Sequence, residues 1–250
     1  MKTKNKLFEE FPAVSKQEWI NKIIQDLKGA DYNKKLVWKT HEGFHVEPVY
    51  TKEDLENLDY LDADPGEFPY VRGQKLDHNH WLIRQDFCIT SPKEANRRIL
   101  QAINNGVNSI GLFNENIHGC PYNEAFSNAE SFAALLKDIN LEKTSINFSG
   151  TTNSAAFLTL LDEYADKILI DKCKITGCIG YDPIGYFIMN GKFHDDEEKV
   201  FDRGNSISEL ANRIMPEIKV FAVNGRHFHN AGASIVQELA FSLSVGAEYI

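Results

Sequence analysis

The sequence predicts an α/β fold in which parallel strands alternate with helices. From residue 84 onward, apolar runs of strand length alternate with longer segments of helical periodicity. Residues that favour helix starts stand at the junctions between the two kinds of segment. About 165 residues follow position 85, and one strand plus one helix of an eight-unit barrel uses roughly 30 residues. We therefore expect five to six units, fewer than a closed eight-stranded barrel needs.

The segment that precedes this series is predicted to be an extension of a different kind, residues 1–83. A helix is predicted over 15–29, because Ser15 and Glu18 form a capping-box pattern at its start. Two strand-like runs, 36–40 and 44–50, surround a short turn and predict a hairpin. A loop rich in proline and glycine follows them. The remainder, 84–250, is the βα series.

The series is predicted element by element from apolar runs and helix starts. Strands are expected near 84–90, 107–113, 144–149, 174–180 and 218–224. Helices are expected near 92–105, 128–138, 153–166, 206–216 and 232–245. Their starts are marked by Ser91 before Pro92, Ser127 with Glu130, Thr152 or Asn153, and Ser206 with Glu209. The same alternation permits an open doubly wound sheet as an alternative.

The final residues, 247–250, resemble the start of a further strand, so we expect a truncated chain. A barrel opened in this way leaves an unpaired strand edge and an uncovered apolar interior. Self-association through this open edge is the expected consequence.

Composition and charge exclude several classes of protein. A net charge of −9 argues against a polyanion-binding surface, so no nucleic-acid partner is expected. No apolar run approaches the length of a membrane span, and the basic start lacks the apolar region of a secretory signal. Four cysteines without CxxC spacing fit reduced thiols in a core, and the acidic run 195–198 fits a solvated loop. We expect a cytoplasmic protein with no membrane partner.

Site-building side chains of a parallel βα series gather at the C-terminal ends of its strands. The polar candidates at these ends are Asp86 to Thr90, Asn114, Asn147 to Thr151, Gly180 to Asp182, and Asn224 to His227. Asn147 and Ser149 belong to a strand end rich in hydroxyl and amide groups, which suits a helix cap and a ligand channel equally.

Two segments carry a resemblance to a known family. The first, PGEFPYVRG followed by WLIRQ, spans residues 65–85; the second runs through NGRHFHNAGAS and QELAF to GAEYI, residues 224–250. Both resemble the methylmalonyl-CoA mutases, adenosylcobalamin enzymes whose substrate domain is a TIM barrel. The resemblance implies a truncated barrel of the TIM type. It also implies that the N-terminal extension makes contacts between subunits.

The resemblance implies roles for individual residues as well. Arg84 matches an arginine associated with CoA binding, and a guanidinium suits phosphate or carboxylate groups. His227 matches a histidine that donates a hydrogen bond to the thioester carbonyl of the substrate. Asn147 and Ser149 resemble small polar residues of the substrate channel. The substrate-binding residues expected in this chain are Tyr70 and Arg72 on rigid turns, Arg84, Asn147, Ser149 and His227.

Three departures from the family pattern coincide. Asp86 stands where the catalytic subunit has a tyrosine, Gly180 where it has a substrate-contacting glutamine, and Arg226 where it has a tyrosine before the histidine. With His227 these are vestigial positions, and we expect no intact catalytic set. The pattern resembles the small, or beta, subunit of the heterodimeric mutase, a non-catalytic homologue that stabilises the large catalytic subunit.

The cofactor follows from the same resemblance. The family's cobalamin domain lies C-terminal to the barrel and carries an Asp-x-His-x-x-Gly signature, which is absent here. We therefore expect no cofactor in this chain and adenosylcobalamin in the parent complex.

The sequence leaves two alternative functions open. A catalytically active acyl-CoA mutase of changed specificity would use Asp86 and Arg226 as specificity determinants. A metal-dependent TIM-barrel hydrolase would use two His-x-His pairs, at 78–80 and 227–229, although the first pair precedes its strand and no metal site is expected.

Overall fold

The computed structural model describes residues 11–78, 80–89, 91–113, 126 and 128–250. The chain separates into two compact units, Met1–Asn79 and His80–Ile250. They are called here the N-terminal unit and the C-terminal unit, and each is described by itself. The functional division at residue 84 stays a prediction.

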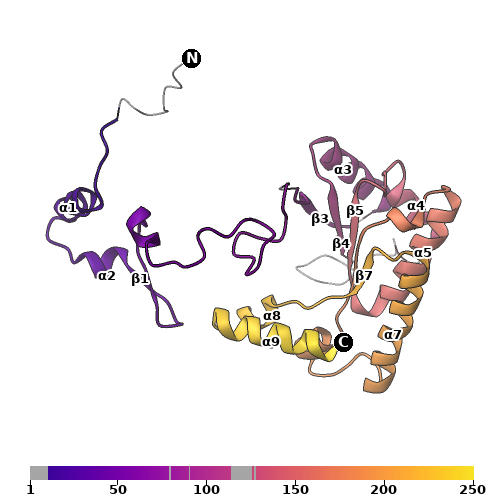
Figure 1. The fold of residues 1–250 in the computed structure, drawn as a ribbon. Coiled ribbons are helices and arrows are strands. Elements are labelled where there is room, and N and C mark those ends of the chain that lie inside the picture. Colours follow the sequence, from indigo (N-terminus) through magenta and orange to yellow (C-terminus); the bar gives the residue numbers. More distant parts are fainter. Residues whose placement is uncertain (1–10, 79, 90, 114–125, 127) are drawn as a thin grey trace, which may run out of the picture. The chain divides into compact units, whose positions relative to one another are not determined.

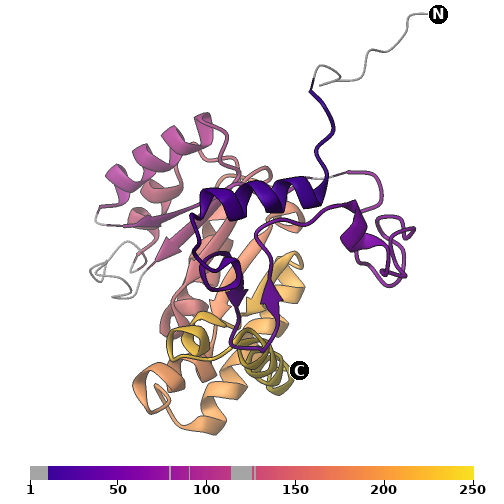
Figure 2. The ribbon, with the colours of Figure 1, turned by 90° about the vertical axis from the view of Figure 1, so that its left-hand side faces the viewer.

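The N-terminal unit is made of short elements (Figure 2). Helix α1 (Lys16–Asp26) begins with the predicted capping box, in which the Ser15 hydroxyl accepts from the Glu18 amide and the Glu18 carboxylate accepts from the Ser15 amide. The remaining elements are α2 (Tyr32–Leu36), the antiparallel pair β1 (Trp38–Lys39) and β2 (His45–Val46), and the 3-10 turn η1 (Lys52–Leu55). The hairpin is therefore shorter than predicted in both strands, and Leu36 of the first predicted run belongs to α2.

Apolar side chains of this unit stay exposed. Thr40 is the one buried residue among those described between 11 and 78. Ile24 on α1 and Trp38 on β1 are 51% and 62% exposed. Since burial of apolar surface drives folding, this unit gains little stability from a core of its own.

The C-terminal unit is built on one parallel sheet (Figure 1). Its strands are β3 (Arg84–Cys88), β4 (Ser109–Phe113), β5 (Ser145–Ser149), β6 (Gly177–Tyr181) and β7 (Ile218–Phe221). They lie in the order β3-β4-β5-β6-β7, so each strand pairs with the next one along the chain. A doubly wound sheet reverses its order at a switch point, and no reversal occurs among these strands. The sequential order is that of a TIM-barrel series, which confirms the predicted fold class.

Helices follow the strands as predicted, with differences at several ends. The helices of the unit are α3 (Pro92–Asn104), α4 (Ala129–Leu136), α5 (Ser154–Lys167), α6 (Pro183–Asn190), α7 (Glu197–Ile214), α8 (Arg226–Asn230) and α9 (Ile235–Glu248). The short 3-10 segments η3 (Thr151–Asn153) and η4 (Lys172–Lys174) lie between them. Helix α4 is capped by Asn128, whose side chain accepts from the Ser131 amide. The predicted cap Ser127 lies outside the described residues.

The second half of the series differs from the prediction in three places. Helix α7 begins at Glu197, so the acidic run is the helix start, and Ser206 lies within the helix and donates to the Asp202 carbonyl. Acidic side chains in a first turn face the positive end of the helix dipole. Helix α6 was not predicted, because PIGYFIMN is apolar around most of its circumference and shows no clear period. Residues 247–250 end α9 and do not begin a strand, with Tyr249 as the C-cap.

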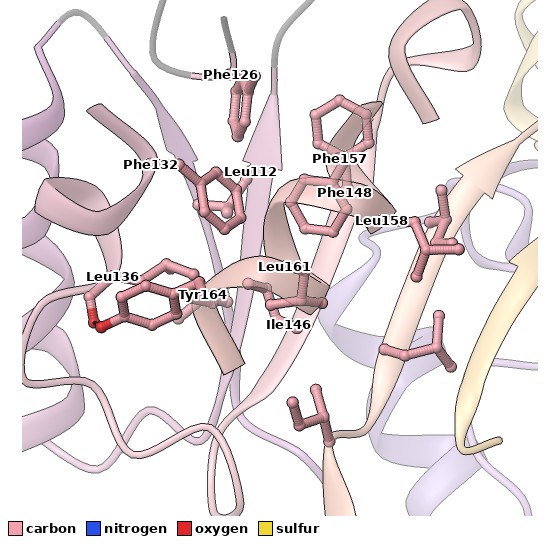
Figure 3. Close-up of a cluster of buried hydrophobic side chains, with 14 of the residues drawn as sticks. Leu112, Phe126, Phe132, Leu136, Ile146, Phe148, Phe157, Leu158, Leu161 and Tyr164 are labelled. Atoms are coloured by element: carbon pink, nitrogen blue, oxygen red, sulfur yellow. Dashed lines mark hydrogen bonds between the residues drawn. The ribbon is translucent and has the colours of Figure 1, made fainter. Parts of the chain in front are cut away.

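The core lies between the sheet and its helices (Figure 3). The rings of Phe148 on β5 and Phe157 on α5 stack with centroids 4.4 Å apart. Phe132 of α4 meets Phe157 edge to face at 5.6 Å, and the buried Tyr164 hydroxyl donates to the Leu136 carbonyl at 2.9 Å. These contacts join β5, α4 and α5 into one apolar layer on a single face of the sheet.

The cysteines differ from the predicted pattern. Cys173 is a free and exposed cysteine, Cys178 is free and partly buried on β6, and Cys88 at the end of β3 is disulfide-bonded. Cys120 lies outside the described residues. The expectation of four reduced core thiols therefore fails at Cys88 and Cys173.

Within the described part of the chain, no helix combines the length and apolar character needed to cross a bilayer.

The core predicts a matched pair of leucine substitutions. Leu161 on α5 is fully buried, whereas Leu169 just beyond this helix is 92% exposed. Leu161→Ala should lower the free energy of unfolding of the C-terminal unit by about 2–5 kcal/mol, because it leaves a cavity. Leu169→Ala should change it by less than about 0.5 kcal/mol. Urea unfolding followed by circular dichroism measures both, and equal effects would contradict this core.

Candidate functional site

The face of the sheet opposite the core carries small and polar side chains. Arg84 and Asp86 on β3 are two residues apart, so their side chains leave the strand on the same face. The Arg84 Nε donates to Asp86 Oδ1 at 2.7 Å, and the two side chains are 45% and 48% exposed. Gly111 on β4 pairs in register with Asp86 and adds no side chain there. This surface is called the polar face below.

Asn147 on β5 continues the polar face. It pairs in register with Gly111, and its Nδ2 donates to Ser109 Oγ at 3.0 Å and to the Ile110 carbonyl at 3.2 Å. Ser145 Oγ lies 3.4 Å from the same nitrogen. Asn147 therefore ties β4 and β5 together. Its amide hydrogens are engaged within the protein.

On the next strand, β6, Gly180 contributes no side chain to the polar face. The backbone there has φ of +69°, in the left-handed region that favours glycine. A Cβ on Gly180 would lie 2.4 Å from the Phe148 carbonyl oxygen. The pairing of β6 with β7 is irregular between Cys178 and Tyr181, which accompanies this conformation. A larger residue at position 180 requires the backbone to move.

His227 lies in a second polar group, near the start of α8. Together with Asp182, Asn224 and Phe228 it lines a crevice that has no space for a water molecule. Burial lowers the pKa of His227, the Asp182 carboxylate raises it and the Arg226 guanidinium lowers it, and the net result is a lowered pKa. Arg226 itself is exposed. His227 is thus held as a neutral imidazole near neutral pH.

A contact that the sequence did not reveal fixes this second group. The Tyr249 hydroxyl donates to Asp182 Oδ1 and accepts from the Ile184 amide at 2.9 Å. Asp182 also caps α6 by accepting from the Gly185 amide at 2.9 Å. Burial and the bond to Asp182 raise the pKa of Tyr249. The end of α9 is thereby fastened to the start of α6.

The predicted substrate residues are not all found in one place. Arg84 and Asn147 share the polar face with Asp86, and Ser149 stands at the end of β5, partly buried. Tyr70 and Arg72 belong to the N-terminal unit, where Tyr70 has φ of +62° and Arg72 lies 3.9 Å from Asp64. Their part in substrate binding stays a prediction. Thr90 and Asn114 lie outside the described residues.

The metal alternative gains no support from the arrangement of ligands. Among the residues that the structure describes, no three His, Cys, Asp or Glu side chains gather where they could hold a metal ion. His229 instead has its Nδ1 3.1 Å from Glu238 Oε2 on α9.

Comparison with known proteins gives a consistent family. The family model described as Methylmalonyl-CoA mutase matches residues 39–115 and 124–250. A methylmalonyl-CoA mutase small subunit from Porphyromonas gingivalis is 40% identical over the whole of this chain and 38% of its own length. From Streptomyces virginiae, a small subunit and a large subunit are each 26% identical, over 98% and 96% of this chain. The chain thus spans between a third and two fifths of the length of these relatives.

The conformation of Gly180 predicts an asymmetric effect of alanine at two glycines. Gly191 has nearly the same φ, +71°, but a Cβ there would have no neighbour within 4 Å. Gly191→Ala should cost about 1–2 kcal/mol from the backbone conformation alone. Gly180→Ala should cost at least about 1 kcal/mol more, because its Cβ meets the Phe148 carbonyl. Urea unfolding compares the two variants, and equal losses would show that position 180 tolerates a side chain.

The burial of His227 and the charges around it predict that its pKa is lowered. Nuclear magnetic resonance of the imidazole ring should give a pKa below the ordinary value of about 6.5. Arg226→Ala should raise this pKa, since it removes a repulsive cation, while Arg213→Ala on α7 should leave it unchanged. The unfolded chain binds this proton more tightly, so His227 contributes a loss of stability as the pH falls below about 6.5. A titration at or above the ordinary value would contradict the burial of the ring.

Proposed function

The chain belongs to the methylmalonyl-CoA mutase family, and we propose that it is part of a small subunit that supports a catalytic large subunit without itself catalysing the reaction. The observation that carries the proposal is the 40% identity to a small subunit across the entire chain. The small and the large subunit from Streptomyces virginiae are equally similar to the chain, each 26% identical over nearly the same span.

The three departures from the catalytic pattern support the non-catalytic assignment, each for its own physical reason. Asp86 replaces an aromatic ring by a carboxylate that is bound to Arg84. Gly180 occupies a backbone conformation that leaves no room for a glutamine side chain. Arg226 is exposed at the first position of α8. An enzyme with a changed substrate would need new substrate contacts at these positions. Gly180 has no side chain to make one.

The reaction we assign to the parent complex is the interconversion of methylmalonyl-CoA and succinyl-CoA with adenosylcobalamin as cofactor. No residue of this chain is assigned to the cofactor, because the Asp-x-His-x-x-Gly signature is missing from its 250 residues. We assign the chain to the cytoplasm from its charge and apolar pattern alone, because the disulfide-bonded Cys88 removes the cysteines from that argument.

The partner we propose is the large mutase subunit, bound in part through the N-terminal unit. That unit exposes Ile24, Trp38 and other large apolar side chains and has almost no buried residue. Such surfaces mark protein interaction sites. Without the partner the chain should self-associate, since β3 and β7 are the edge strands of the described sheet.

Co-purification tests the partnership. The chain should form a complex when it is co-expressed with a methylmalonyl-CoA mutase large subunit that carries an affinity tag. Deletion of residues 1–50 should lower the amount recovered at least about tenfold, because it removes α1 and the hairpin. The double variant Ile24→Ser with Trp38→Ser should weaken recovery without removing the backbone.

Matched controls use exposed polar neighbours, Asn21→Ser on α1 and Lys39→Ser on β1, which should leave recovery unchanged. Failure of the intact chain to bind the large subunit would refute the proposed partner. The active-mutase alternative predicts a different result, namely acyl-CoA mutase turnover by the full-length subunit with adenosylcobalamin and no partner.

A further inference from the structure

The Arg84 and Asp86 pair has an unusual position for a half-exposed ion pair. Its two members belong to one strand and lie side by side on the polar face. Guanidinium groups bind carboxylates and phosphates through a planar fork of five donors. Here the Nε position of that fork already holds a carboxylate of the same chain.

Gly111 on the neighbouring strand β4 leaves space for this pair. A Cβ on Gly111 would lie 1.8 Å from Asp86 Oδ1 and 2.7 Å from Arg84 Nη2. The pair therefore lies across β4 and fills the space that a side chain at position 111 would take. Glycine at position 111 is therefore what allows the pair to adopt this arrangement.

An external anion would have to displace a tethered competitor. Because Asp86 is attached two residues from Arg84, its effective concentration at the guanidinium is on the order of millimolar or higher. A displaced Asp86 carboxylate would still lie on the same face and repel a second anion. Asn147 adds no free amide donor, since its Nδ2 is bound to Ser109 and Ile110.

We propose that Asp86 is a built-in counter-ion that closes an anion-binding site at Arg84 on the polar face. The ligand it excludes is a carboxylate or phosphate group. This inference rests on the proposed function and deepens it. A companion subunit that leaves Arg84 occupied does not compete with the large subunit for an anionic acyl-CoA substrate.

Titration of the intact chain with two simple anions tests the inference. Succinate is the carboxylate probe, and inorganic phosphate is the phosphate probe. Each replaces chloride, so that the ionic strength stays constant. The Arg84 Nε–H signal and the Gly111 amide signal are followed by nuclear magnetic resonance. The variants are Asp86→Asn, which keeps the shape of the side chain, and Asp86→Ser, which is smaller and needs no added space.

Both Asp86 variants should bind at least one of the anions at least about tenfold more tightly than the unmodified chain. Adding Arg84→Met to Asp86→Asn should return binding to the level of the unmodified chain. The anion that binds more tightly identifies the chemistry of the site. Equal binding by the unmodified chain and both variants, or no binding by any of them, would overturn the inference. Because no large subunit is present, either result is independent of the proposed partnership.

Discussion

The sequential order of the parallel strands is the constraint on which the rest of the structure depends. Each strand pairs with the next one along the chain. Connections between parallel strands are right-handed as a rule, and this places the connecting helices of such a series on one face of the sheet. Apolar residues such as Leu112 and Phe148 then pack on that face, and the alternate positions, such as Gly111 and Asn147, form the opposite one. The polar face of the sheet is thereby separated from the core that stabilises the unit.

Two departures from the family pattern lie on this polar face, and each has its own physical effect there. Asp86 acts through charge, because it neutralises Arg84 and lies over the vacant side-chain position of Gly111. Gly180 acts through the backbone, because its left-handed conformation brings the chain against the Phe148 carbonyl. His227 is partly buried and lines a narrow crevice together with residues of α6 and α9.

The sequence predicted what depends on local pattern. The five strands follow from apolar runs, and the start of α1 follows from the spacing of Ser15 and Glu18. Helix α6 escaped prediction because its residues are apolar on most sides, and the start of α7 because its acidic run suits a loop equally well. The bond between Tyr249 and Asp182 joins residues 67 positions apart, which no local pattern encodes. The fit of Asp86 over Gly111 likewise depends on strand register.

The central claim is that this chain contributes structure and no catalysis to a mutase. The most direct measurement is the turnover of a heterodimer whose full-length small subunit carries His227→Ala, beside one whose large subunit carries the same change at its matching histidine. Our account predicts turnover within about twofold of the unmodified complex in the first case and a loss of about 10²-fold or more in the second. A comparable loss in the first case would contradict it.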